Sequence, residues 1–376
     1  MESRWRDPDG PRLSRGDVSR RAASRGHMDE ALEAEMQVLE GQWNAVDSEV
    51  APTQIREKTR LRLRRTTYAF EVEVDYDFTK STQANYSAVL GEAVGPYRTI
   101  RERLDSEYHG QYVARRQSLQ DQFIADAVST ARPSRCPWLI FTAGPMGAGK
   151  SHVIQHMHEA GHFVLDTLVH CDPDLFKAAL PEWPGYVKRD RLNAGMLCHR
   201  ESCMLVEIAM EVALSGHMNC WVDGSLKDGV WYRKVIEDVT ERYPHYQVAI
   251  IEVQATTSVI FQRIAKRAAE TGRDIPQEDV LDSIERVPRS VAALCDLVHF
   301  YARVDNSSYD GGAPKLTKFC DQEICYVMSS EDDVGKGWSE IRRRFGAEKR
   351  LSVSQAVARV EVESEWGVAA AKSAKL

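Results

Sequence analysis

The sequence has no run of eighteen apolar residues, and no apolar segment follows its first methionine. A membrane-spanning helix needs about 20 predominantly apolar residues, and a secretory signal needs an apolar stretch close to the N-terminus. We therefore expect a soluble, non-secreted protein of the cytoplasm that makes no contact with a membrane.

Cysteine pairs of the C-x-x-C type are absent as well, although the chain has eight cysteines. Cys198, His199 and Cys203 lie close together, but their spacing does not match that of known zinc sites. Most of the other cysteines fall in or beside apolar stretches. The pattern predicts buried thiols in a reducing compartment rather than disulfides or a zinc site.

Basic residues are not in excess, because 49 Lys and Arg stand against 56 Asp and Glu, a net charge of −7. Proteins that bind nucleic acids neutralise phosphates with a clear surplus of Lys and Arg. A nucleic-acid partner is therefore not expected. With 376 residues, 43% of them hydrophobic, the chain is long enough for one large core and a smaller one.

The first 131 residues change character along their length. Residues 1–27 are rich in Arg without hydrophobic periodicity, which predicts a disordered tail, and their acidic residues argue against a transit peptide. Apolar residues at helical spacing predict helices over 32–46 and 97–130, and aromatic residues that alternate with acids predict one half-buried strand over 68–78. Residues 28–131 should thus form a mainly helical α+β extension that packs on the remaining chain or binds a protein partner.

Further along, eight consecutive residues follow the pattern G-x-x-x-x-G-K-S between an apolar run and a helix-compatible stretch. Glycines let the backbone turn so that successive N–H groups point at phosphates, and the following helix adds its positive N-terminal end. Lys150 would reach the β- and γ-phosphates and Ser151 would bind Mg²⁺, so we predict ATP and Mg²⁺ as cofactors. This loop consists of Gly144, Pro145, Met146, Gly147, Ala148, Gly149, Lys150 and Ser151.

Apolar strand patterns alternate with helix patterns from residue 132 onward. Strands are predicted at 138–142, within 162–171, at 220–222, 248–253 and 298–304, and helices up to 161, over 193–215 and over 258–270. Together with the phosphate-binding loop, this alternation predicts a three-layer α/β/α P-loop NTPase domain with a mostly parallel sheet over residues 132–330. A hairpin around Cys320 and Cys325 should follow, and then a C-terminal helical tail over 331–376 with a short helix near 338–345.

Acidic residues follow two of the predicted strands, at the sheet edge where ligands bind. Asp172 precedes a proline and a helical run, as a helix N-cap does, and it is also placed to face a substrate. Asp174 would project toward the phosphate-binding loop, where a carboxylate can accept a proton from an attacking hydroxyl, or it would only complement the helix dipole. Asp223 would order magnesium-bound water and the acceptor, or form a structural turn.

Charged residues on two predicted helices are further candidates. Glu201 shares a stripe with apolar side chains, and substrate binding would explain an acid there, whereas Glu207 lies on the polar face and is expected in solvent. Arg263, Arg267 and Arg273 lie on or just after the helix 258–270. They would form a lid over the transferring phosphoryl group, or Arg263 and Arg267 would belong to a surface ion-pair ladder.

Together these motifs resemble the zeta toxin family of P-loop kinases, in particular its long eukaryotic members, over about residues 108–306. Bacterial members phosphorylate the 3′-hydroxyl of the sugar in UDP-N-acetylglucosamine, so the resemblance implies an ATP-dependent kinase of a small hydroxylated metabolite such as a nucleotide sugar. The matching segments are Tyr108-His109, Arg116-Gln117, Gln120-Asp121, Ala143–His152, Asp172–Lys177, Leu180–Trp183, Glu201-Ser202, Asp223–Ser225 and Gly272–Pro276.

The resemblance also implies roles for single residues. Asp174 would be the base that activates the acceptor hydroxyl, and Arg273, with Arg263 or Arg267, would stabilise charge on the phosphoryl group. Asp-Gly-Ser over 223–225 stands where bacterial members often carry Glu-Gly-Thr. The residues that would contact the acceptor are Asp172, Glu201, Asp223 and Ser225, and those that would hold the nucleotide are residues 144–151 with His152.

Two functions of other classes also fit the sequence. A nucleic-acid 5′-hydroxyl kinase would share the phosphate-binding loop, but it would need a basic groove, against which the acidic net charge argues. A non-catalytic nucleotide-binding module would use residues 28–130 as its partner surface. Lys150 and Asp174, both present here, favour a catalyst.

Overall fold

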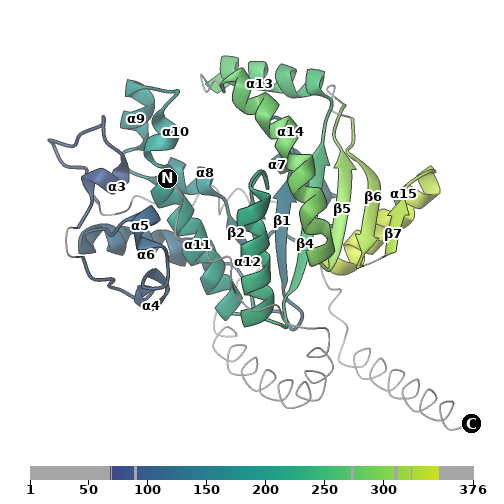
Figure 1. Cartoon of the computed structure of the whole chain (residues 1–376), viewed down its shortest axis with the longest axis horizontal. Coiled ribbons are helices and arrows are strands. Elements are labelled where there is room, and N and C mark those ends of the chain that lie inside the picture. The colour runs from purple at the N-terminus through teal and green to yellow at the C-terminus, as the bar shows by residue number, and fades with distance from the viewer. Residues whose placement is uncertain are drawn as a thin grey trace, which may run out of the picture.

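The structure, a computed structural model, describes residue 68 and residues 70–88, 91–271, 275–308, 312–322 and 324–346. One seven-stranded sheet, with strand order β2-β3-β1-β4-β5-β6-β7, lies at its centre (Figure 1). Strands β1 to β5 pair in parallel, and β6 and β7 form an antiparallel hairpin at one edge. The strands are β1 Trp138–Ala143, β2 Val169–Cys171, β3 Cys220–Asp223, β4 Gln247–Gln254, β5 Phe300–Asp305, β6 Lys315–Asp321 and β7 Ile324–Val327.

Helices connect the strands, as Figure 1 shows. They include helices at each position where the sequence predicts one after residue 132, although the stretch 193–215 is divided into two, and the strands confirm the predicted alternation. The helices of this part are α7 Lys150–Glu159, α8 Pro173–Ala179, α9 Trp183–Arg189, α10 Ala194–Leu197, α11 His199–Ser215, α12 Gly229–Arg242, α13 Thr257–Thr271, α14 Gln277–Leu294, the 3-10 helix η2 Cys295–Leu297 and α15 Glu331–Phe345.

Alternate residues of β1 serve two separate cores, because successive side chains of a strand point to opposite faces. Leu139 and Phe141 join a cluster with residues of α11, α12 and α14, and also of α6 (Ala114–Val128). Trp138 and Ile140 join a second cluster with residues of α7 and α15. The sheet therefore lies between two helical layers, which confirms the predicted three-layer α/β/α fold.

The helices α12 and α14 are absent from the prediction. Pro288 argues against a helix in the sequence, yet it lies inside α14, whose buried side chains include Val280, Val287 and Val291. Val287 and Val291 belong to the core beside the sheet, and Val280 packs with Ile260 and Ile264 of α13. The burial of these valines outweighs the cost of the proline. No helix within the described residues is long and apolar enough to cross a membrane.

The described part of the extension is mainly helical, but the single helix predicted over 97–130 is wrong. Three helices occupy this stretch: α4 Arg98–Arg101, α5 Ser106–His109 and α6. Asp105 caps α5 by accepting hydrogen bonds from two backbone N–H groups, and Gly110 ends it with a positive φ of 77°. These two residues break the helix, because a left-handed turn is accessible to glycine and stops helical pairing.

The strand predicted over 68–78 is also wrong within the described residues, because that segment is irregular and pairs with no other strand. Its aromatic side chains are anchored one by one instead. The Tyr68 ring packs edge-on against Phe123, and the Tyr76 hydroxyl lies 2.7 Å from that of Tyr186. Val74 is fully exposed. The segment is followed by α3 (Thr82–Asn85).

The structure also corrects the prediction that no cysteines pair. Cys320 and Cys325 form a disulfide between directly opposite positions of β6 and β7. The hairpin register brings the two Cβ atoms together, which sequence spacing alone does not reveal. Cys171, Cys198 and Cys220 are buried free thiols as predicted, whereas Cys136 is exposed. The predicted tail 1–27, the helix over 32–46 and residues 347–376 lie outside the described residues.

Candidate functional site

The phosphate-binding loop connects the end of β1 to the first turn of α7, as the sequence predicts. Gly147 and Gly149 have φ angles of 82° and 85°, which residues other than glycine rarely adopt. A Cβ on Gly144 would lie 2.5 Å from the carbonyl oxygen of Val253 in β4. The three glycines are therefore required by the backbone turn and by the close approach of the central strands.

Three side chains from distant segments hold this loop in place. The Ala148 carbonyl oxygen accepts hydrogen bonds from Asn306 Nδ2 at 2.8 Å and from Arg263 Nη1 at 3.0 Å. The backbone N–H of Met146 donates to Ser283 Oγ on α14 at 3.3 Å. Arg263 thus supports the loop through its hydrogen bond to Ala148. Sequence analysis missed Asn306 and Ser283, although Asn306, a polar residue just after an apolar strand, carried a usable signal.

Lys150 lies folded over the loop that it belongs to. Its Nζ atom donates to the carbonyl oxygens of Gly144 at 3.0 Å and Pro145 at 3.3 Å. Ser151 and His152 are exposed in the first turn of α7, where helix N–H groups and the helix dipole favour anions. The loop therefore presents an ammonium group and a hydroxyl group on one accessible helix end.

Three side chains converge at the carboxyl ends of β2 and β3, next to the loop. One ligand atom each of His170, Asp172 and Asp223 lies within 4.8 Å of the others. Asp223 Oδ1 accepts a hydrogen bond from Thr142 at 2.8 Å, and the His170 ring stacks on Trp221 with 3.8 Å between ring centres. Two carboxylates in such a cluster have the oxygen donors that Mg²⁺ prefers.

Burial and mutual repulsion oppose ionisation of both carboxylates. Burial, together with the charge of Asp174, raises the pKa of Asp172 to about 6. Burial and the charge of Asp172 also raise the pKa of Asp223, against the opposing effect of His170 and Lys150. A bound cation would relieve this repulsion, so the residues present fit a divalent metal ion.

This pKa shift predicts a pH-dependent gain in stability for Asp172→Asn. Asp172 caps α8 by accepting from the Asp174 N–H at 2.8 Å, and Asn is an equally good cap. Because the folded-state pKa is about 6 against 3.8 unfolded, the ionised carboxylate costs stability above pH 6 and nothing below pH 3.8. We expect the variant to be more stable by on the order of 2 kcal/mol at pH 7.5 and unchanged at pH 3.5.

Denaturant unfolding at the two pH values, without nucleotide or metal, measures this difference. An equal gain at both pH values would show that the ionisation of Asp172 is not the cause.

Asp174 lies in the first turn of α8, on the side of this cluster that faces α11. Its side chain is 46% exposed, and its Oδ1 atom lies 3.1 Å from Nζ of Lys177. The charges of Asp174 and Lys177 act on His199 and Cys203 of α11 as well as on Asp172. The carboxylate is therefore accessible and close enough to the cluster and to α11 for its charge to act on groups of both.

Glu201 does not lie where an acceptor could touch it, which corrects the predicted contact. Its side chain is fully buried and accepts hydrogen bonds from Arg116 and Gln120. Glu207 is not simply in solvent either, because its Oε1 atom lies 3.2 Å from Nε2 of the buried His109. The apolar stripe of α11 correctly indicated that Glu201 points inward, but its partner is a cation rather than a substrate.

The remaining predicted residues are partly outside the described structure. Ser225 accepts at its backbone oxygen from the Gly144 N–H at 3.2 Å, so it adjoins the start of the loop. Arg267 lies in α13, but its side chain is outside the described residues, and so is Arg273. Their predicted role in stabilising the phosphoryl group stays a prediction.

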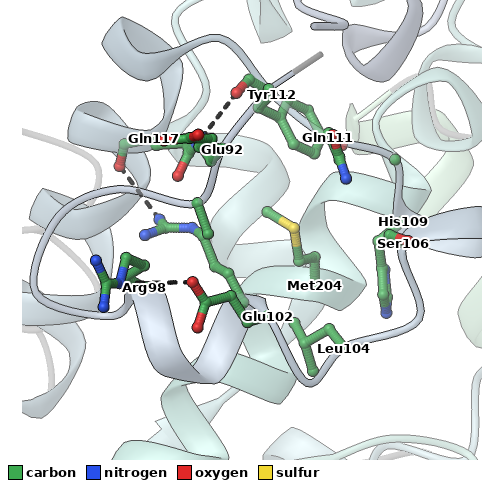
Figure 2. A pocket seen from close by; sticks show the side chains of 14 residues that line it. Glu92, Arg98, Glu102, Leu104, Ser106, His109, Gln111, Tyr112, Gln117 and Met204 are labelled. Atoms are coloured by element: carbon green, nitrogen blue, oxygen red, sulfur yellow. Dashed lines mark hydrogen bonds and ion pairs between the residues drawn. The ribbon is translucent and has the colours of Figure 1, made fainter. Parts of the chain in front are cut away.

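A separate cavity of about 460 Å³ lies in the extension, between α4, α5, the start of α6 and Met204 of α11 (Figure 2). Arg98 and Glu102 form an ion pair at its rim, with 3.5 Å between Nε and Oε1. Gln117 at its edge is held by the Tyr112 carbonyl oxygen at 2.8 Å. None of the predicted site residues lines this cavity.

The fold and the loop define the class of the protein: it is a nucleotide-binding kinase of the P-loop type. The zeta toxin family model matches residues 122–312, just over half of the chain. The chain therefore belongs to the zeta toxin family. No curated protein matches it.

Solved structures with a similar fold share little sequence identity with this chain. One, from the PezAT chromosomal toxin–antitoxin system of Streptococcus pneumoniae, is 15% identical with a TM-score of 0.41, over 65% of this chain and 96% of that chain. Another, AvrRxo1-ORF1:-ORF2 with ATP, is 16% identical with a TM-score of 0.48, over 73% of this chain and 83% of that chain. The family assignment rests on the family match and not on these similarities.

Proposed function

We propose that this protein transfers the γ-phosphoryl group of ATP to a hydroxyl group of a small metabolite, and that a nucleotide sugar such as UDP-N-acetylglucosamine is the acceptor. The observation that carries the proposal is the half-exposed carboxylate of Asp174 at the sheet edge that also holds the phosphate-binding loop. A structural capping acid would not be needed there, because Asp172 already caps α8.

In this reaction Asp174 accepts the proton of the acceptor hydroxyl as its oxygen attacks the γ-phosphorus. A new O–P bond forms, the bond between that phosphorus and the β,γ-bridging oxygen breaks, and ADP leaves with the electron pair. Lys150, released from its carbonyl partners, binds the β- and γ-phosphate oxygens. Catalysis of this type depends mainly on positioning and charge stabilisation.

Mg²⁺, when bound, neutralises the phosphate charge and fixes the geometry of the nucleotide. Ser151 and the carboxylates of Asp172 and Asp223 would hold it. Arg263 supports the loop on which these groups depend, and Arg273 or Arg267 is proposed to neutralise charge on the transferring phosphoryl group.

The test is a phosphate-transfer assay with the full chain, labelled ATP and Mg²⁺. The acceptor panel contains nucleotide sugars, free nucleosides and oligonucleotides with 5′-hydroxyl ends, with Asp174→Asn as the matched control. We expect a labelled nucleotide sugar from the wild type and almost none from the variant. Transfer to oligonucleotide ends alone would identify a nucleic-acid kinase, and no transfer to any acceptor would refute the proposal.

A further inference from the structure

Three charged side chains form a fully buried cluster that contains none of the residues of the phosphate-binding loop. Arg116, Glu182 and Glu201 are each 0 to 1% exposed. Arg116 donates to Glu201 from Nε at 2.7 Å and from Nη2 at 3.0 Å, and to Glu182 from Nη1 at 3.0 Å and Nη2 at 3.1 Å. One guanidinium thus holds two carboxylates by paired, charge-assisted hydrogen bonds.

Two neutral side chains complete the cluster. Gln120 Nε2 donates to Glu201 Oε1 at 2.8 Å, and the Tyr86 hydroxyl donates to Glu182 Oε1 at 2.5 Å. Although burial opposes ionisation of Glu201, the Arg116 charge and hydrogen bonds keep its pKa below the usual value. Glu201 is therefore ionised at neutral pH and depends on Arg116 for that state.

The donors and the acceptors come from different parts of the chain. Tyr86, Arg116 and Gln120 all precede residue 122, where the family match begins. Glu182 directly precedes α9, and Glu201 lies in the first turn of α11, both inside the match. The extension thus supplies the cation that two buried carboxylates of the kinase domain require, because an uncompensated buried charge is strongly destabilising.

The first turn of α11 connects this cluster to the acceptor side of the site. His199 begins α11, two residues before Glu201, and its pKa is lowered by burial and then by the charge of Lys177, while Asp174 acts in the opposite direction. Helix α8, which carries Asp174 and Lys177, packs on α11. A shift of the start of α11 would therefore move the groups that surround Asp174.

We propose that Arg116 is a positioning residue for the acceptor: by fixing Glu182 and Glu201, it sets the placement of α9 and α11 against α8. The stretch 70–121 is then a component of the acceptor-binding half of the kinase and not a separable partner domain. This inference rests on the proposed function, since it concerns the acceptor of that reaction. Arg263, Asn306 and Ser283 hold the nucleotide side independently.

The experiment weakens the cluster without removing its charge. Arg116→Lys keeps a cation but loses the planar fork, and Gln120→Met loses one hydrogen bond to Glu201. We expect each to raise the KM for the acceptor about tenfold, as expected for a lost charge-assisted bond, and to change the KM for ATP less than twofold. Arg98→Met is the matched control, because Arg98 also precedes residue 122, is 61% exposed and pairs with Glu102, which is not part of the cluster.

Hydrogen–deuterium exchange of the same variants, without substrates, gives a readout that needs no activity. We expect faster exchange at residues 174–190 and 199–206, and unchanged exchange at 144–151. The wild type could show no phosphorylation of any acceptor while the variants still show this exchange pattern. In that case the acceptor assignment fails, and the positioning link stands.

Equal increases in both KM values, or faster exchange in the loop as well, would overturn the inference by showing general destabilisation. The same changes in Arg98→Met would overturn it too. If Arg116→Lys does not fold, Gln120→Met alone decides between these outcomes.

Discussion

Asp174→Asn should lower kcat for phosphoryl transfer by about 10²- to 10⁴-fold, the usual contribution of a general base. The amide cannot take the proton of the acceptor hydroxyl, although it has almost the same size. Folding should be retained, because the side chain is 46% exposed and Asp172 provides the cap of α8. Steady-state assays with the acceptor identified in the panel measure kcat, and thermal unfolding measures stability.

Two outcomes separate the role of Asp174 from a general charge effect. The KM for ATP should stay within about twofold, because Asp174 is not part of the loop. Asp332→Asn is the control: it removes an exposed acid from the first turn of α15, and it should change neither kcat nor the KM for ATP. A loss of activity below about fivefold in Asp174→Asn would exclude it as the base and direct attention to Asp172 or Asp223.

Lys150→Met should reduce kcat/KM for ATP by about 10²- to 10³-fold, the effect of removing one group that stabilises developing charge. Lys150 Nζ donates to the carbonyl oxygens of Gly144 and Pro145. The loop itself is held by hydrogen bonds of Arg263, Asn306 and Ser283, so loss of the lysine side chain should leave it in place. The thermal midpoint without nucleotide should therefore hardly change.

The control for this variant is Lys336→Met, an exposed lysine of α15. Binding of ATP by calorimetry should weaken in Lys150→Met and stay unchanged in the control. Unchanged transfer by Lys150→Met would mean that the loop does not hold the triphosphate.

The sequence predicts those parts of the site that depend on neighbouring residues. The glycines of the loop, the strand before it and the helix after it form one continuous segment, so local physics is sufficient to predict them. The same holds for Asp172, whose capping of α8 follows from the proline beside it. Apolar strands that alternate with helices predict the parallel sheet, because their hydrophobic runs are continuous.

The contacts between distant segments could not be predicted in this way. Arg116 and Glu201 are 85 residues apart, and Asn306 and Ala148 are 158 residues apart, so no local pattern relates them. The alternation of acidic and aromatic residues over 68–78 gave a wrong strand prediction for a related reason. Its period matched a strand, but within the described residues no second strand pairs with it, and the rings are held by separate tertiary contacts.

The position of β2 at the edge of the sheet affects how easily this part of the chain opens locally. This edge strand has only three residues and pairs with β3 within the described residues, whereas β1 pairs along its whole length with β4 and over Leu139–Thr142 with β3. Breaking a short outer ladder requires less free energy than disrupting a central one, and local opening follows such differences. We therefore expect the end of β2 that leads into Asp172 and Asp174 to open locally more readily than the central strand that leads into the phosphate-binding loop.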